Sequence, residues 1–301
     1  MNGPYNIPHP IPYQGSKRLI APTILAYCPR HVQRLVEPFA GSAALSLASA
    51  YRKRAASFWV NDAHRPLVAL WREILQRPAA LADRYQDLWE AQKDRERRFF
   101  DEVRARFNRE HDPADFLYLL ARCVKAAIRY NSSGEFNNTP DNRRLGARPT
   151  EMAQRILGAS ELLADRTRLT AWDYARVLVK CSARDLIYMD PPYQGVCGDR
   201  DQRYAPKIRH EQFCTELESL NQRGLMYIIS YDGRTGDKEY GEPMPSELDL
   251  LHLEIRVGRS TQATLLGRKC VTFESLYLSP ALRRRLPKSV RAGEQLELAF
   301  G

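Results

Sequence analysis

Apolar residues gather in short runs that alternate with helical patterns in the first and last parts of the chain. The run 35–39 leads through the glycine turn at Gly41 into an alanine-rich stretch that ends at Tyr51, which predicts strand, tight turn and helix. A second run, 58–60, precedes Asp62. Further runs that predict strands lie at 186–189, 226–229, 251–257 and 271–278. This alternation is typical of an α/β fold with a mostly parallel sheet.

The middle of the chain, residues 63–150, has charged helical patterns and no strong strand signal. Its helical patterns lie at 71–75, 99–107 and 116–128. We therefore expect a discontinuous catalytic, cofactor-binding domain formed by residues 1–62 and 151–280. The helical insertion 63–150 interrupts it, and residues 281–301 form a basic tail.

Composition narrows the class of protein. The 301 residues, 44% of them hydrophobic, can bury a full core, and the formal charge of +10 favours encounter with a polyanion. The six cysteines include no CxxC pair, so neither a zinc site nor a disulfide framework is expected. The N-terminus lacks the apolar segment of a signal peptide, and no run is long enough to span a membrane. We expect a soluble protein of the reducing cytoplasm.

The most specific motif is Asp190-Pro191-Pro192-Tyr193, at the end of a predicted strand, where α/β sheets bind ligands. An amine on an aromatic base is a poor nucleophile because its lone pair is delocalised. The Asp190 carboxylate and the Pro191 carbonyl can each accept one amine hydrogen and draw the nitrogen toward tetrahedral geometry. Pro191 and Pro192 stiffen the backbone, and Tyr193 offers a face for an extruded base. The alternative is an ordinary turn, in which Asp and Pro are common.

Two segments near the N-terminus predict a cofactor pocket. In Glu37-Pro38-Phe39-Ala40-Gly41-Ser42, Gly41 allows close approach of the backbone to a cofactor, and Phe39 can pack along it. Glu37 and Asp62 are expected to end adjacent strands, with Asp62 placed to take a ribose hydroxyl. In Tyr13-Gln14-Gly15-Ser16-Lys17, Lys17 can meet a carboxylate, and Tyr13 can lie on a sulfonium or an adenine ring. An exposed N-terminal turn is the alternative.

Together these segments resemble the Dam-like alpha group of amino-specific DNA adenine methyltransferases, in the same order along the chain as in that family. The resemblance implies a class I S-adenosylmethionine-dependent methyltransferase fold, a Rossmann-like, mostly parallel sheet with a helical target-recognition insertion. It implies site-specific methyl transfer from S-adenosyl-L-methionine to N6 of adenine in a base flipped out of double-stranded DNA, with no metal. The expected cofactor-binding residues are Tyr13, Gly15, Lys17, Glu37, Pro38, Phe39, Gly41, Asp62, Asp173 and Asp190.

The segment 129–137 resembles the DNA-contacting hairpin of that family. The expected DNA-binding residues are Lys125, Arg129, Tyr130, Asn131, Arg143 and Arg144, whose donors suit base edges or phosphates. A solvated loop is the alternative. Members that read GATC usually carry Tyr-Asn where this chain has Val124-Lys125, so the recognition sequence stays open.

Three alternative functions remain. An N4-cytosine methyltransferase uses the same chemistry but more often has Ser at the position of Asp190. RNA-directed amino methyltransferases usually have Asn there and lack the large insertion. A catalytically silent DNA-binding protein of this fold has no need of an intact motif at 190–193. His64 and His210 have no partner at metal-ligand spacing and are expected at the surface or at helix starts.

The basic tail ends in a pattern formed by Gln295, Leu298 and Phe300. This pattern is similar to the peptide with which bacterial replication and repair proteins engage the sliding clamp. A clamp is therefore an expected partner. The alternative is that the apolar terminus docks back onto the body of the protein.

Overall fold

The computed structural model describes residues 7–192, 208–235, 238–240, 243–259 and 271–287. Tyr193 and the tail residues Gln295, Leu298 and Phe300 lie outside the described residues. Within those ranges, no helix combines the length and the apolar character that crossing a bilayer requires.

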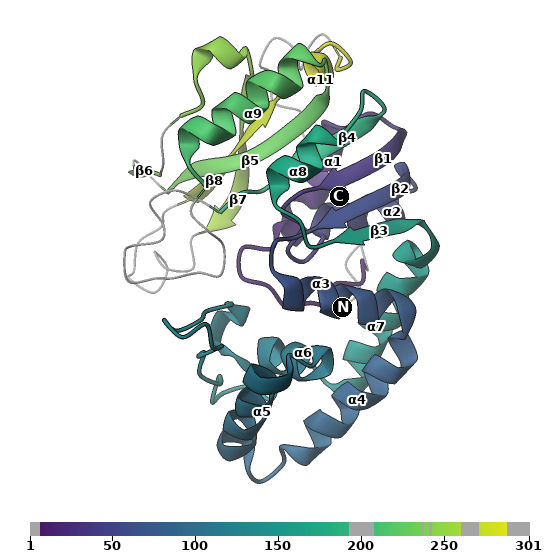
Figure 1. The fold of residues 1–301 in the computed structure, drawn as a ribbon, viewed down its shortest axis with the longest axis vertical. Coiled ribbons are helices and arrows are strands. Elements are labelled where there is room, and N and C mark those ends of the chain that lie inside the picture. Colours follow the sequence, from purple (N-terminus) through teal and green to yellow (C-terminus); the bar gives the residue numbers. More distant parts are fainter. Residues whose placement is uncertain (1–6, 193–207, 236–237, 241–242, 260–270, 288–301) are drawn as a thin grey trace.

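A single mixed sheet organises the chain (Figure 1), with the strand order β3-β2-β1-β4-β5-β8-β7. The strands from β3 to β5 run parallel, β8 is antiparallel to both of its neighbours, and β6 pairs with β5. The mostly parallel sheet of the class I methyltransferase fold was predicted and is confirmed. The strands are β1 (Val32–Glu37), β2 (Ala55–Asn61), β3 (Thr167–Thr170), β4 (Asp185–Met189), β5 (Met226–Thr235), β6 (Lys238–Tyr240), β7 (Leu251–Arg259) and β8 (Val271–Leu278).

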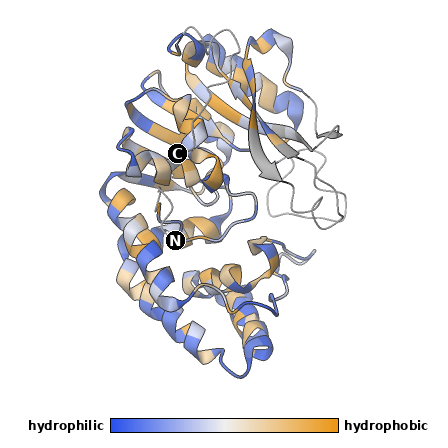
Figure 2. Cartoon of the chain, turned by 180° about the vertical axis from the view of Figure 1, so that it is seen from behind, coloured by the Kyte–Doolittle hydropathy of each residue, from blue (hydrophilic) through white to orange (hydrophobic). Residues whose placement is uncertain are grey.

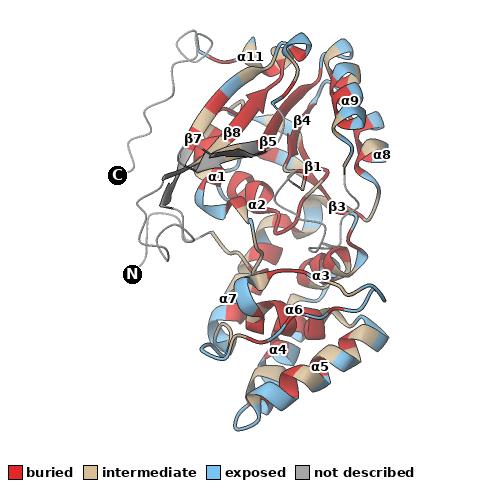
Figure 3. Cartoon of the chain, turned by 90° about the vertical axis from the view of Figure 1, so that its left-hand side faces the viewer, coloured by how far each residue is buried: buried red, intermediate tan, exposed pale blue. Residues whose placement is uncertain are grey.

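Helices cover both faces of the sheet. Side chains of a strand alternate between its faces. On β4, Leu186 and Tyr188 belong to the core that includes α1 (Ala21–Ala26) and α2 (Ala44–Tyr51), whereas Ile187 and Met189 pack with α8 (Tyr174–Val179) and α9 (His210–Gln222). Figure 3 shows these central strands buried, and Figure 2 shows them as largely hydrophobic. The apolar runs of the sequence are thus strands enclosed on both sides.

The middle of the chain forms a helical region beside the sheet (Figure 1), and proline lies in the first turn of several of its helices, where no backbone donor is lost. α7 packs against α4 and α3, so it joins this region to the sheet, where it also meets α2. The remaining helices are η1 (Lys17–Leu19), α3 (Arg65–Gln76), α4 (Pro78–Ala91), α5 (Glu96–Glu110), α6 (Pro113–Arg122), η2 (Val124–Ala126), α7 (Pro149–Leu163), η3 (Ala164–Arg166), η4 (Ser246–Leu248) and α11 (Pro280–Arg283).

The helix expected at 116–128 is shorter than predicted. It ends at Arg122, because Cys123 is extended and both Lys125 and Ala126 take positive φ angles, 59° and 49°. The Ala126 carbonyl instead accepts a hydrogen bond of 3.0 Å from the Gln14 N–H. The apolar pattern continues past Arg122 and so gave no sign of the sharp turn at Lys125 and Ala126, which contacts the N-terminal segment.

Three other features depart from the sequence pattern. β3 was not predicted, because it has four residues and only Leu169 among them is apolar. The strand predicted at 226–229 continues to Thr235, and a further short strand, β6, follows it. The first residues of the expected tail pack onto the body, since Leu282 and Leu286 are buried in the main core.

Candidate active site

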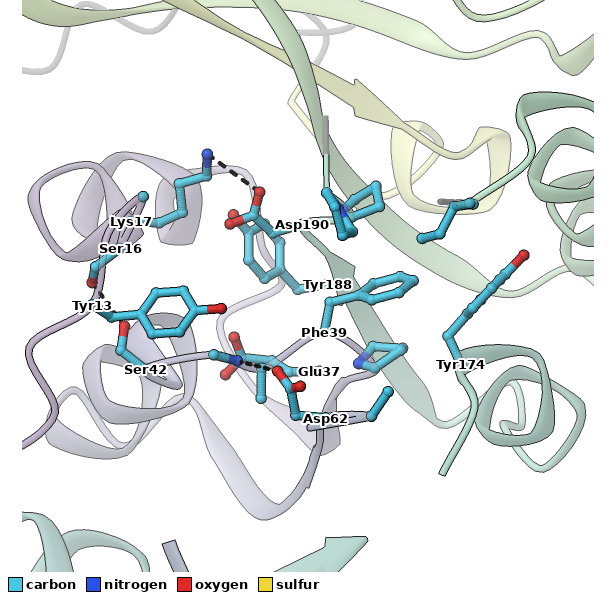
Figure 4. A pocket seen from close by; sticks show the side chains of 18 of the residues that line it. Tyr13, Ser16, Lys17, Glu37, Phe39, Ser42, Asp62, Tyr174, Tyr188 and Asp190 are labelled. Carbon is cyan, nitrogen blue, oxygen red and sulfur yellow. Dashed lines mark hydrogen bonds and ion pairs between the residues drawn. The ribbon is translucent and has the colours of Figure 1, made fainter. Parts of the chain in front are cut away.

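Three carboxylates meet where adjacent parallel strands end (Figure 4). Glu37 ends β1, Asp62 follows β2, and Asp190 follows β4, and these strands are neighbours in the sheet. The predicted adjacency of the strands that end at Glu37 and Asp62 is confirmed. All three side chains line one cavity of about 290 Å³. The sheet therefore brings acidic groups that are distant in sequence to one edge.

The Gly41 turn forms the floor of this cavity. Gly41 has a φ of +52°, and a Cβ at this position would lie 3.0 Å from the Tyr13 ring. Its N–H donates to Asp62 Oδ2 at 2.9 Å, and its carbonyl accepts from Trp71 Nε1 at 3.0 Å. The turn thus requires glycine both for its backbone conformation and for the close approach of Tyr13.

Burial sets the protonation of the two carboxylates beside this turn. Glu37 is 2% exposed, its Oε1 accepts from the Ser46 N–H at 2.8 Å, and burial raises its pKa to about 7. Asp62 is 6% exposed and also accepts from the His64 N–H at 2.9 Å, and burial raises its pKa to about 6. Such groups are stabilised as anions by a bound cation.

Lys17 lies on the opposite side of the cavity from Asp62 (Figure 4). Its Nζ is 3.2 Å from Asp190 Oδ1 and 2.5 Å from Glu274 Oε1. Ser230 Oγ donates to the same Glu274 oxygen at 2.7 Å. Burial and Glu274 raise the pKa of Asp190, whereas Lys17 lowers it. The sequence prediction identified Lys17 and Asp190 but missed Glu274 and Ser230.

Aromatic rings close another side of the cavity. The rings of Phe39 and Tyr174 have centroids 5.0 Å apart. Asp173, expected beside a cofactor adenine, caps α8 by accepting from the Ala175 N–H at 2.9 Å. The Pro38 carbonyl accepts from Asn61 Nδ2 at 2.8 Å, which fixes the backbone before Phe39. The two rings are tilted by 34° to each other and form an apolar wall on which a purine ring can pack.

The expected hairpin at 129–137 is present, with an isolated antiparallel bridge between Tyr130 and Phe136. The Asn131 side chain accepts from the Ser133 and Glu135 N–H groups and so stabilises the turn. The Tyr130 hydroxyl lies 2.6 Å from His64 Nε2. Tyr130 and Asn131 therefore each have a hydrogen-bond partner within the protein.

The basic residues expected to bind DNA are exposed. Four of them lie exposed on and around the hairpin: Lys125, Arg129, Arg143 and Arg144. Arg144 lies 3.8 Å from Asp141, an exposed ion pair of small energetic value. None of the four lines the cavity, but Ala126, directly after Lys125, does. The hairpin region thus borders the cavity.

The structure gathers the expected site residues at one place. Each of the ten expected cofactor residues lines the cavity, as do the catalytic candidates Pro191 and Pro192, while Tyr193 lies outside the described residues. The part of the chain that the structure describes has no cluster of three or more His, Cys, Asp or Glu side chains that can hold a metal. His64 is the N-cap of α3 and His210 begins α9, but His64 is buried rather than superficial.

The sequence comparisons agree with this architecture. Residues 13–255 match the family model of the D12 class N6 adenine-specific DNA methyltransferases. The chain belongs to this family. The predicted resemblance is therefore confirmed, and the matched residues include the glycine turn, the helical region and Asp190.

Named relatives are moderately similar. The chain is 29% identical over 244 residues to a DNA N-6-adenine-methyltransferase of Escherichia phage P1, a match that covers 75% of this chain and 30% of that protein. It is 29% identical over 224 residues to the retron Ec67 DNA adenine methylase of Escherichia coli, covering 72% and 75%. It is 25% identical over 238 residues to the modification methylase StsI of Streptococcus sanguinis, covering 74% and 35%. The chain thus spans well under half the length of two of these relatives.

Proposed function

We propose that this protein transfers a methyl group from S-adenosyl-L-methionine to N6 of adenine in double-stranded DNA. The observation that carries this proposal is the position of Asp190 and Pro191 on one cavity with the Gly41 turn. The two groups that can accept hydrogen bonds from an amine therefore lie in the same cavity as the turn that suits a cofactor. Membership in the D12 class supports the choice of base and of substrate.

The residues present fit S-adenosyl-L-methionine. The Gly41 turn lines the cavity with backbone that carries no side chain, and the Phe39–Tyr174 wall suits an adenine ring. The buried carboxylates of Glu37 and Asp62, with pKa values raised by burial, suit a cofactor that carries positive charge and ribose hydroxyls. Bound there, the cofactor supplies an electrophilic methyl group on a sulfonium.

The chain's own groups then act on the target amine. The Asp190 carboxylate and the Pro191 carbonyl accept the two amine hydrogens, which localises the nitrogen lone pair and aims it at the methyl carbon. Formation of the nitrogen–carbon bond at the oriented amine would be balanced by loss of the carbon–sulfur bond, whose electron pair the cofactor would retain. The methylated amine then loses one proton to solvent or through Asp190. No covalent enzyme intermediate is required.

The decisive experiment measures transfer of a labelled methyl group from S-adenosyl-L-methionine to duplex DNA by the wild-type chain and by Asp190→Ala. We expect the variant to lose transfer by on the order of 100-fold or more while it keeps its DNA affinity, since one oriented acceptor is removed. Asp87→Ala, at an exposed position on α4, is the matched control and should transfer at the wild-type rate.

The outcomes separate the competing functions. Nucleoside analysis of the product should show N6-methyladenine, whereas N4-methylcytosine would establish the cytosine alternative. Transfer to RNA in preference to duplex DNA would contradict the proposed substrate. A folded, cofactor-bound wild-type protein that methylates no nucleic acid would leave only the silent DNA-binding protein.

We place the DNA-binding surface at the exposed basic residues around the hairpin. Lys125 carries the positive φ of 59° at the turn where the helical region reaches the cavity. Ala126 and Ile128 of this segment line the same cavity as Asp190, so DNA held at Arg129 would lie beside the entrance through which an extruded base reaches Asp190. The hairpin residues Tyr130 and Asn131 stay predicted DNA contacts, although the structure gives each of them an internal partner.

The tail pattern formed by Gln295, Leu298 and Phe300 stays a proposal about a partner. Its residues lie outside the described part of the chain. A sliding clamp would tether the enzyme near newly replicated, unmethylated DNA and raise its local concentration there. Titration of purified clamp with the tail peptide and with its Leu298→Ala, Phe300→Ala version decides the matter: equal binding of both peptides rejects it.

A further inference from the structure

The proposed catalytic residue Asp190 shares the buried ammonium of Lys17 with a second carboxylate, Glu274. Lys17 is 8% exposed, and its Nζ lies closer to Glu274 Oε1, at 2.5 Å, than to Asp190 Oδ1, at 3.2 Å. The side chains of Asp190 and Glu274 are 21% and 12% exposed. The Lys17 ammonium is thus held between the two carboxylates, and its shorter contact is with Glu274.

The sheet itself holds Glu274 in place. Ser230, fully buried on β5, donates its hydroxyl to Glu274 Oε1 at 2.7 Å. Ser230 pairs with Leu276 on β8, and Glu274 is two residues from Leu276, so both side chains lie on one face. A carboxylate anchored on paired strands is more precisely oriented than one on a loop.

We propose that Glu274, oriented by Ser230, is a positioning residue that keeps the Lys17 ammonium shared, so that Asp190 remains a strong acceptor for the target amine. This inference rests on the proposed function. Among the described residues, Lys17 contacts two carboxylates, and the negative charge of Glu274 raises the pKa of Asp190, which makes Asp190 a stronger acceptor. A lysine paired with Asp190 alone would occupy that carboxylate and weaken it as an acceptor.

The groups that face Asp190 all enter this balance. Glu274 favours the protonated form of Asp190, and Lys17 favours its anion. Tyr188 stays neutral, because burial raises its pKa well above the usual value. In the described part of the chain, the titratable and polar groups of this cluster are Lys17 from η1, Glu37 from β1, Tyr188 from β4, Ser230 from β5 and Glu274 from β8.

The test is Glu274→Gln, which keeps the shape of the side chain and an oxygen for Lys17 and Ser230 but removes the charge. We expect the acidic limb of the kcat pH profile to move about one unit lower and kcat at its plateau to fall on the order of 10-fold. Affinity for S-adenosylhomocysteine should change less than about twofold. An unmoved acidic limb, or an effect confined to cofactor affinity, overturns the proposal.

A second readout does not depend on turnover. Carbon-13 NMR of labelled aspartate, with the Asp190 signal assigned through Asp190→Asn, should show a lower Asp190 pKa in Glu274→Gln than in the wild type. This shift is expected even if the protein methylates nothing, so failure of the proposed function and failure of this inference are distinguishable. An identical Asp190 pKa in both proteins rejects the inference.

Three variants complete the design. Ser230→Ala should shift the Asp190 pKa in the same direction by a smaller amount, because Glu274 keeps its charge but loses its anchor. Glu274→Asp should return the pH profile toward the wild type, and a profile that matches Glu274→Gln contradicts the role of charge. Glu218→Gln, at an exposed position on α9 over the opposite face of the sheet, removes the same charge and should leave the profile unchanged.

Discussion

The buried carboxylate of Glu37 makes a quantitative prediction about stability. Glu37 is 2% exposed, and burial raises its pKa from 4.5 to about 7. Because its pKa is higher in the folded than in the unfolded protein, the folded state holds the proton more tightly. Ionisation of Glu37 therefore lowers the unfolding free energy increasingly as pH rises from 4.5 to about 7. Above that range the destabilisation keeps its full value.

Glu37→Gln removes this ionisation while its oxygen still accepts from the Ser46 N–H. Integrating the shift predicts that the unfolding free energy of the variant, minus that of the wild type, rises by about 2 to 3 kcal/mol between about pH 5 and about pH 8. Groups that do not interact with Glu37, such as His9 with a pKa lowered by burial to about 4, titrate equally in both proteins and cancel in the difference.

Urea unfolding of the cofactor-free protein at several pH values measures this difference directly. Glu161→Gln, at an exposed position on α7, is the matched control and should show no such rise. The variant that is more stable at high pH should also bind S-adenosyl-L-methionine more weakly, because a cation gains less from a neutral amide. A stability difference that is the same at all pH values would refute the assignment of a raised pKa to Glu37.

Two further perturbations test the cavity floor and the DNA surface. Gly41→Ala should destabilise the turn by about 1 to 2 kcal/mol and displace Tyr13, so titration calorimetry should show weaker cofactor binding; an unchanged dissociation constant contradicts the proposed floor. Alanine at Lys125, Arg129 and Arg143 together should weaken DNA binding and flatten its salt dependence in fluorescence anisotropy, and unchanged affinity and methylated sequence would place recognition elsewhere.

Local patterns were sufficient to predict much of this molecule. The apolar run before Asp190 predicts a buried strand, and the turn at Gly41 predicts a strand-to-helix junction, because both signals lie within a few neighbouring residues. The adjacency of Glu37 and Asp62 follows from the order of parallel strands in this fold class. The first two predictions depend on residues within one segment, and the third depends only on which strands are neighbours in the sheet.

Glu274 was missed because its partners come from distant segments. Lys17 and Ser230 reach it only after β8 has paired antiparallel with β5. One signal was nevertheless present: Glu274 alternates with Leu276 and Leu278 on the buried face of its strand, where an acid requires a partner. An isolated charge in the buried register of a predicted strand therefore identifies a candidate even when its partner cannot be named.

Tyr130 shows the converse limit of motif-based prediction. His64 Nδ1 accepts from the Leu67 N–H, so Nε2 carries the ring proton and donates it to the Tyr130 hydroxyl. Burial lowers the pKa of His64 to about 3, which keeps this ring neutral. The backbone N–H of His64 donates to Asp62, which in turn accepts from the Gly41 N–H. Tyr130, expected to contact DNA, is thereby connected by hydrogen bonds through His64 and Asp62 to the Gly41 turn. A motif confined to residues 129–137 cannot show that connection.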